Sequence, residues 1–263
     1  HFMPAFERGM SLHEAEIDAI TSNKDEATFE NTILAYDNAG QMLAQTELVF
    51  GMLCAAETND RMQALQEQAM PLLAAHRDKI RLDDKLFVRV KEVYDRRAAL
   101  GLDAEQMRLL QKTYDSFVRA GALLDAEQKA RLKEINGQLS LTAVKFGNNI
   151  LAENNNFVLE LKSDELDGLP AGIRDAAREK AQQMGKGDKW VFTLHKPSLI
   201  PLLTYSTRRD LREKIYKAYL NRCNNGDEYD NKQLINDFIR LRTEKAHLLG
   251  YPVSYTHLTL PTT

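Results

Sequence analysis

His13 and Glu14 open the sequence HEAEI and are the residues that come nearest to a metal-binding motif. A helical zinc site of the HExxH type needs a second histidine four residues after the first, because that spacing places both imidazoles on one face of the helix. Position 17 is Ile17, so the second ligand is absent, and we interpret His13 as a solvated residue in a first helical turn. The other histidines are scattered, and none has a second His or Cys at ligand spacing: His1, His76, His195, His247 and His257.

Other catalytic motifs are also absent from the 263 residues. No serine lies in a GxSxG sequence, and no glycine-rich loop follows a predicted strand. The Gly-Lys-Gly sequence at Gly185–Gly187 is typical of a turn, and the acidic pair Asp227–Glu228 is typical of a solvated turn before a helix. Arg242 and Lys245 are typical of the solvated face of the last helix. The sequence therefore predicts no catalytic, cofactor-binding or metal-binding residue within this chain.

Composition narrows the functional classes. A chain of 263 residues can bury a substantial core in one or two domains. With 35 basic and 38 acidic residues and a net charge of −3, it has no electrostatic character that favours nucleic acid. The longest apolar stretches, such as 198–205, are interrupted by proline and too short to span a membrane. Cys54 and Cys223 form no CxxC pair, and the sequence is compatible both with two free thiols and with a disulfide between them.

The hydrophobic pattern is mostly helical. Thr28 is predicted to cap a helix that begins at Phe29, with Asn31 at its third position. This helix could extend to about residue 57, with Gly40 and Gly51 as weak points. Further helices are predicted over 61–79 and from Asp83 or Asp84 to about Leu100.

The sequence LDAEQ occurs twice, and we interpret the two copies as independent helix starts capped by Asp103 and Asp125, each with Gln at the third position. In the first of these helices, apolar residues fall on one stripe: Met107, Leu110, Tyr114, Phe117, Val118 and Gly121. The opposite face is polar: Arg108, Lys112, Asp115 and Arg119. This pattern predicts an ordinary helix that faces the core. The second helix is expected to run from Ala126 toward Glu153, with bends possible at Gly137 and Gly147.

One small sheet interrupts the helices. Residues 157–161 and 190–194 have the β-branched and aromatic content of strands, and a short helix is predicted between them over 170–184. An antiparallel pair is the simplest arrangement, since an isolated strand would leave its backbone groups unpaired. The predicted fold is therefore mainly α with one two-stranded β element. No linker interrupts the chain, so we expect one helical unit over 1–251.

Five segments resemble, in the same order, the thimet oligopeptidase and peptidyl-dipeptidase family of zinc metallopeptidases. They are HFMPAF (1–6), TFENTI (28–33), FVRAGA (117–122), LHKPSLIPLLTY (194–205) and the two charged helices with an Asn-rich turn over 205–251. The turn NNGDEYDN (224–231) is most similar to bacterial peptidyl-dipeptidases. Cys223 departs from the glycine expected there, which puts the local turn geometry in question, because glycine takes positive φ freely and cysteine does not.

The resemblance implies the multi-helix N-terminal region of a zincin-type peptidase that hydrolyses short peptides, removes C-terminal dipeptides and comes from the bacterial cytoplasm or periplasm. In such a parent protein, two histidines of HExxH and a downstream Glu hold zinc, and this region forms one wall of the substrate channel next to a C-terminal catalytic domain. The chain contains no HExxH, so no catalytic residue is carried over and the chain itself is expected to be inactive and without zinc. A non-catalytic helical scaffold or peptide-binding module is the alternative.

Both ends of the chain are expected to be incomplete. The chain begins at His1, and its first motif normally follows a leader and a short N-terminal segment. At the other end, 253–263 (VSYTHLTLPTT) contain no charged residue. One reading frame of a transposon-end adapter used in sequencing libraries encodes VSYTHLTLPT, and Pro252 and Thr263 fit the bases left over. We therefore interpret 252–263 as a non-native tail; an edge strand is the alternative.

Overall fold

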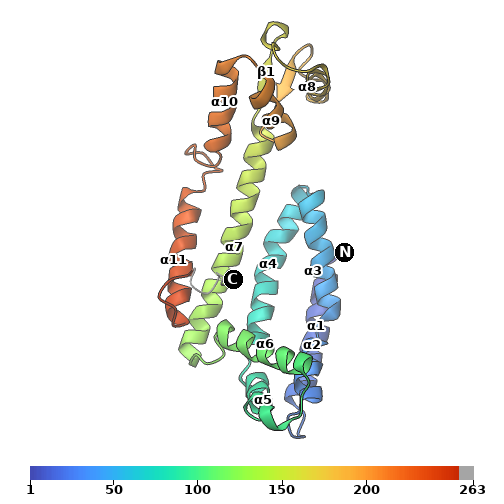
Figure 1. The fold of residues 1–263 in the computed structure, drawn as a ribbon, viewed down its shortest axis with the longest axis vertical. Coiled ribbons are helices and arrows are strands. Elements are labelled where there is room, and N and C mark those ends of the chain that lie inside the picture. Colours follow the sequence, from blue (N-terminus) through green and yellow to red (C-terminus); the bar gives the residue numbers. More distant parts are fainter. Residues whose placement is uncertain (255–263) are drawn as a thin grey trace. The chain divides into compact units, whose positions relative to one another are not determined.

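A computed structural model describes residues 1–254 of the chain, and these residues fold mainly into helices with one small sheet (Figure 1). The long helices are α1 (Phe2–Thr21), α3 (Gln41–Ala56), α4 (Asp60–Arg81), α5 (Asp84–Asp95), α6 (Ala104–Ala120), α7 (Ala126–Asn156), α8 (Ala171–Gln183), α9 (Lys196–Tyr205), α10 (Arg209–Leu220) and α11 (Lys232–Leu248). Shorter elements are the π-helical turn Phe29–Leu34, α2 (Ala35–Asp37), the 3-10 turns Arg97–Ala99 and Ser163–Glu165, and strands β1 (Leu159–Leu161) and β2 (Trp190–Phe192). The predicted mainly α fold with a two-stranded β element is confirmed.

The helices divide into two compact units, where the sequence predicts one. The first unit holds His1–Val144 and the residues from Phe238 onward, and the second holds Lys145–Asp237. Both boundaries fall inside regular helices, α7 and α11, so no linker marks them in the sequence. The assignment of 1–251 to one helical region of a larger protein stays a prediction. None of the helices within residues 1–254 has the length and apolar character needed to cross a membrane. The predicted non-native tail lies mostly outside the described residues, so it stays a prediction.

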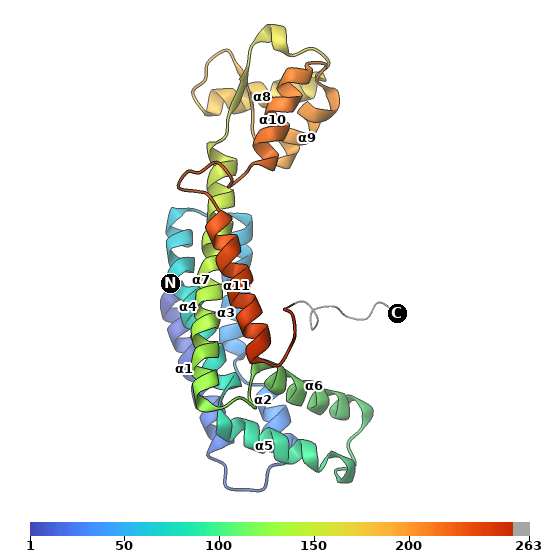
Figure 2. The same ribbon diagram turned by 90° about the vertical axis from the view of Figure 1, so that its left-hand side faces the viewer.

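In the first unit, α1 packs against α3 and α4 (Figures 1 and 2). The packing is close because Gly9 of α1 faces Leu43 of α3, where an added Cβ atom would lie 3.0 Å from the Leu43 backbone. Phe6 and Phe50 meet edge to face with ring centroids 5.3 Å apart, a geometry that aromatic pairs favour. A larger core lies where α1, α5 and α6 meet the π-helical turn, around residues such as Ile33 and Phe117.

Local side-chain caps begin several of the helices, including the three for which the sequence predicts them. The Thr28 hydroxyl accepts the Asn31 amide proton at 3.1 Å, while the Asn31 side chain accepts from the Thr28 amide at 2.8 Å. Asp103 and Asp125 each form the same reciprocal box with the Gln three residues later. The predicted long helix over 29–57 is wrong in one respect, because the chain turns at Gly40, whose φ of 76° ends the helical path.

The second unit is built around the small sheet. β1 and β2 pair antiparallel, with Leu159 opposite Phe192, and α8, α9 and α10 bury their apolar faces against the sheet or against one another. The turn that follows α10 is held by Glu153 of α7, whose carboxylate accepts from the Cys223 amide at 2.8 Å and from the Asn225 side chain. Cys223 has φ of 55° and is the one non-glycine residue with positive φ among residues 1–254, so the doubt about this turn is justified.

Candidate functional site

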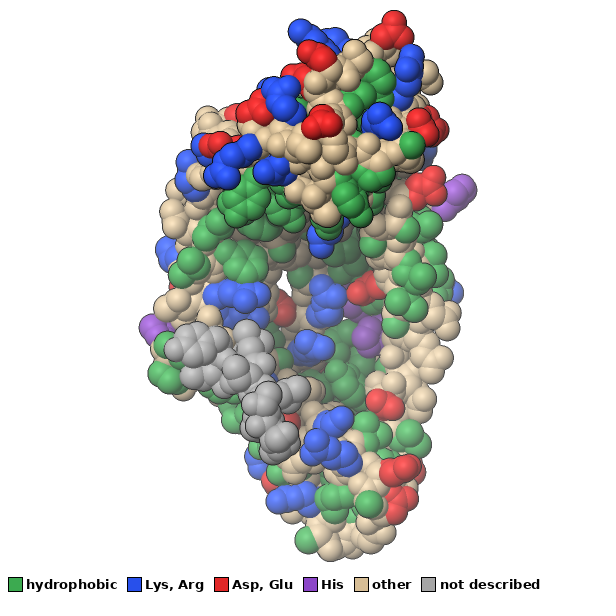
Figure 3. Space-filling view, turned by 45° about the horizontal axis from the view of Figure 1, so that its top comes forward, with side chains coloured by type: hydrophobic (Ala, Val, Ile, Leu, Met, Phe, Trp, Pro, Cys, Tyr) green, Lys and Arg blue, Asp and Glu red, His purple; other side chains and the backbone are tan. Residues whose placement is uncertain are grey.

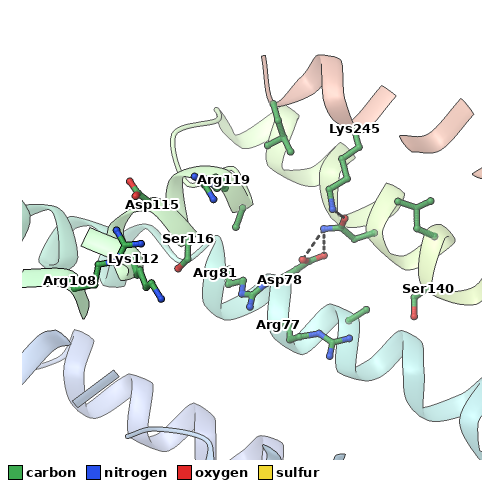
Figure 4. A pocket seen from close by; sticks show the side chains of 15 residues that line it. Arg77, Asp78, Arg81, Arg108, Lys112, Asp115, Ser116, Arg119, Ser140 and Lys245 are labelled. Carbon is green, nitrogen blue, oxygen red and sulfur yellow. Dashed lines mark hydrogen bonds between the residues drawn. The ribbon is translucent and has the colours of Figure 1, made fainter. Parts of the chain in front are cut away.

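A basic pocket of about 990 Å³ lies in the first unit, where α4, α6, α7 and α11 meet (Figure 4). Its polar lining consists of six basic side chains, two carboxylates and three neutral groups: Arg77, Arg81, Arg108, Lys112, Arg119 and Lys245; Asp78 and Asp115; Ser116, Asn136 and Ser140. No aromatic residue lines the pocket. The site is therefore a local concentration of positive charge on a chain whose net charge is −3.

The polar face of α6 supplies three of the cations. Leu110 and Phe117 are fully buried on the core side of this helix, which leaves Arg108, Lys112 and Arg119 exposed on the other side. The predicted division of the helix into an apolar and a polar face is confirmed. Its description as an ordinary helix that faces the core is incomplete, since the polar face lines the pocket.

A bridge of hydrogen bonds joins three helices across the pocket. The Asn136 side-chain amide of α7 donates to both carboxylate oxygens of Asp78 on α4, at 2.9 and 3.0 Å. The Asn136 carbonyl oxygen accepts from Lys245 Nζ of α11 at 2.6 Å. Lys245 is half-buried in this arrangement, so the expectation that it lies on a solvated face is wrong; Arg242 is exposed as expected. The contact that removes Lys245 from solvent comes from a residue 109 positions earlier in the chain.

Burial perturbs the two charged ends of this bridge. It raises the pKa of the Asp78 carboxyl above its ordinary value, and the Asn136 hydrogen bond and the Lys245 charge oppose this rise. It also lowers the pKa of Lys245, against the attraction of Asp78. Both charged forms are therefore held in a partly desolvated place by Asn136 and by each other.

Some of the remaining charged groups of the pocket have a side-chain partner, and others have no ion-pair partner. Arg77 pairs with Glu47 at 3.2 Å, and Asp115 accepts from the Gln111 side chain at 2.9 Å. Arg108, Lys112 and Arg119 have no ion-pair partner among residues 1–254. Figure 3 shows several Lys and Arg side chains on the face that it draws.

A histidine pair lies beside a second cavity of about 480 Å³ in the same unit. His13 Nδ1 and His76 Nε2 are 3.1 Å apart, and Glu14 lies 3.4 Å from the far nitrogen of His76 and 2.8 Å from Lys79 Nζ. His13 is half-buried in the middle of α1, so its predicted place in a solvated first turn is wrong. Sequence spacing could not reveal this pair because 63 positions separate the two histidines.

The histidine pair does not complete a metal site within the described chain. Among residues 1–254, no group of three or more His, Cys, Asp or Glu side chains lies together in a way that could hold a metal ion. Structural zinc needs four such ligands, and catalytic zinc three plus water. Burial lowers the pKa of both His13 and His76, and the charge of His76 lowers that of His13 further.

The other residues singled out in the sequence have structural places. His195 bonds to Asn155 at 3.2 Å, and His247 lies 3.2 Å from the Pro252 carbonyl oxygen. Gly185 and Gly187 both have positive φ in a turn, as predicted. The Asp227 carboxylate accepts from the Tyr229 amide at 3.0 Å in the exposed turn before α11, and Glu228 is exposed in the same turn. Cys54 and Cys223 are both free thiols.

Comparison with known proteins places this chain in a family. The model of peptidase family M3 matches residues 202–262. The dipeptidyl carboxypeptidase of Escherichia coli (strain K12) is 36% identical over 253 residues, or 96% of this chain. The chain belongs to peptidase family M3. Further relatives are the Salmonella typhimurium dipeptidyl carboxypeptidase, 34% identical over 96% of the chain, and the Haemophilus influenzae oligopeptidase A, 27% identical over 100% of it. This M3 chain spans 37%, 37% and 39% of the length of these three relatives.

Three sequence landmarks of this M3 chain have packing explanations. Thr28 in TFENTI caps the π-helical turn, and the rings of Phe2 and Phe6 in HFMPAF pack at an angle against the ring of Phe50. Gly121 in FVRAGA ends α6 with φ of 102°, and a Cβ atom there would lie 2.7 Å from Leu132 of α7. These segments have roles in the scaffold, and one of them also reaches the pocket, because Arg119 of FVRAGA lies in its lining.

Proposed function

We propose that this chain is the N-terminal helical part of a zinc metallopeptidase that hydrolyses short peptides and releases dipeptides from their C-termini. The observation that carries the proposal is the 36% identity to a dipeptidyl carboxypeptidase across 96% of the chain. In this proposal, the helices form one wall of a channel that admits flexible oligopeptides and excludes folded proteins. Zinc and the residues that activate water belong to a part of the peptidase that these 263 residues do not cover.

The proposal assigns no catalytic step to the described chain. No zinc ligand set occurs among residues 1–254, and the sequence contains no HExxH motif. We therefore derive no catalytic step from these residues. Their proposed contribution is to bound the space in which a peptide substrate lies.

The test compares the 263-residue chain with the protein encoded by the complete reading frame of its gene. Both are given an N-terminally blocked tetrapeptide, and the products are identified by mass spectrometry. We expect the complete protein to release C-terminal dipeptides and to lose this activity with a chelator, whereas the 263-residue chain binds no stoichiometric zinc and cleaves nothing. Release of single amino acids would indicate a different peptidase class. A native stop codon near Tyr251 would favour the non-catalytic scaffold or peptide-binding module.

A further inference from the structure

The three unmatched cations of the basic pocket lie along one helix. Arg108, Lys112 and Arg119 occupy the same face of α6 and line the cavity together. Like charges spaced four apart on a helix repel and destabilise it. Asp115 lies on the same face, three residues after Lys112 and four before Arg119, and offsets part of this repulsion. None of the three cations forms an ion pair with a carboxylate within residues 1–254. An anionic ligand would supply the missing partners.

The spacing of these cations indicates the length of the ligand. Arg108 and Arg119 are separated by about 16 Å along the axis of α6, given a rise of about 1.5 Å per residue. A single carboxylate or phosphate cannot span this distance. An extended peptide covers it with about five residues, at roughly 3.3 Å each. The cavity of about 990 Å³ is at the upper end of the range of small-ligand pockets, which suits a short peptide.

The chemistry of the lining favours a peptide over a nucleic acid. Single-stranded nucleic acids bind to basic grooves that also provide aromatic side chains for base stacking, and no aromatic residue lines this pocket. Arginine guanidinium groups match carboxylates with two parallel hydrogen bonds. The hydroxyl groups of Ser116 and Ser140 lie in the same lining and can bond to peptide backbone groups.

We propose that the basic pocket of α4, α6, α7 and α11 binds an extended acidic peptide, whose Asp or Glu side chains pair with Arg108, Lys112 and Arg119. The inference rests on the charges and geometry of this pocket and does not depend on catalysis. It goes beyond the peptidase proposal by assigning a site and a preference for acidic peptides. It predicts direct binding by the 263-residue chain.

Fluorescence anisotropy tests the proposal with a labelled, acetylated and amidated hexapeptide of glutamate, with the glutamine hexapeptide as the uncharged control. We compare the chain with R108Q/K112Q/R119Q, and with K24Q/R61Q/K85Q as a matched variant. The second variant removes the same charge from exposed residues that do not line the pocket. Circular dichroism establishes that each variant is folded.

We expect the glutamate peptide to bind in a salt-dependent way and the glutamine peptide to bind at least tenfold more weakly. The pocket variant should lose about tenfold in affinity, as expected for three exposed ion pairs, and the matched variant less than twofold. Equal losses in the two variants would show non-specific electrostatic attraction and overturn the assignment. So would equal binding of the two peptides, or binding of a thymidine hexanucleotide at least as tight as that of the glutamate peptide.

Discussion

Replacement of Asn136 by alanine should loosen the helices around the basic pocket. Asn136 on α7 is the common partner of Asp78 on α4 and Lys245 on α11, through three hydrogen bonds of 2.6–3.0 Å. In N136A, the carboxylate and the ammonium group keep their half-buried positions but lose the group that satisfies them both. Water can reach each of them, which limits the loss without restoring the link between helices.

The expected cost is about 2.5 kcal/mol. Hydrogen bonds to charged groups contribute about 1.5–3 kcal/mol each, and Asn136 serves two such groups, which gives about 3 kcal/mol at the lower end of that range. The lower end applies because Asp78, Asn136 and Lys245 are all half-buried. Alanine forms helix more readily than asparagine by roughly 0.5 kcal/mol, which offsets part of this loss.

Urea unfolding followed by circular dichroism measures the change in the free energy of unfolding. Q138A is the matched control, since Gln138 lies on the same helix and its side chain bonds only to the exposed Glu134 four residues earlier, at 3.1 Å. We expect Q138A to unfold within about 0.5 kcal/mol of the unaltered chain. If N136A were as stable as Q138A, the bridge would contribute nothing and the account of the pocket given above would be wrong.

Two further predictions concern the first unit. Burial lowers the pKa of His13 and His76, so the unfolded chain binds more protons than the folded chain in mild acid. The free energy of unfolding should therefore be retained above about pH 6.5 and fall as the pH drops toward the lowered pKa values of the two histidines. In urea unfolding, the stability of H76Q should depend less on pH than that of the unaltered chain. An equal dependence would contradict this. G121A should lower the free energy of unfolding in urea by roughly 2–3 kcal/mol, because alanine is strained at φ of 102° and its Cβ would lie 2.7 Å from Leu132. The control G51A places a Cβ in open space within α3 and should be neutral or slightly stabilising. An unchanged stability of G121A would refute the steric argument.

Local signals in the sequence account for most of the secondary structure. Capping residues such as Asp103 and Asn59 determine helix starts through contacts only a few positions away, so they can be recognised without the fold. Glycine gives a weaker signal. Gly40 breaks the helix because its positive φ lets it lie against the His13 ring, where a Cβ atom would be 2.8 Å away, while Gly51 continues a regular helix. The two glycines therefore differ in whether a side chain from another helix, His13 of α1, lies against them.

The candidate site could be predicted only in part, for the same reason. The polar face of α6 follows from helical periodicity, but the pocket needs α4, α7 and α11 beside it. Its internal contacts join residues 58 and 109 positions apart. Lys245 therefore looks like any surface lysine in the sequence and becomes half-buried only when Asn136 is placed next to it. The two boundaries between units have no signal in the sequence, because they fall within α7 and α11.

The peptidase proposal and the pocket proposal rest on independent observations, so their tests can separate two kinds of protein. The first rests on sequence identity that extends over 96% of this chain but 37% of its relative. The second rests on the placement of charges within one unit of this chain. If acidic peptides bind to the pocket and the complete protein cleaves none, the chain is a peptide-binding module on a peptidase scaffold. If the complete protein cleaves peptides and the pocket variant binds them unchanged, substrate selection lies elsewhere in the peptidase, and the cations of α6 need another explanation.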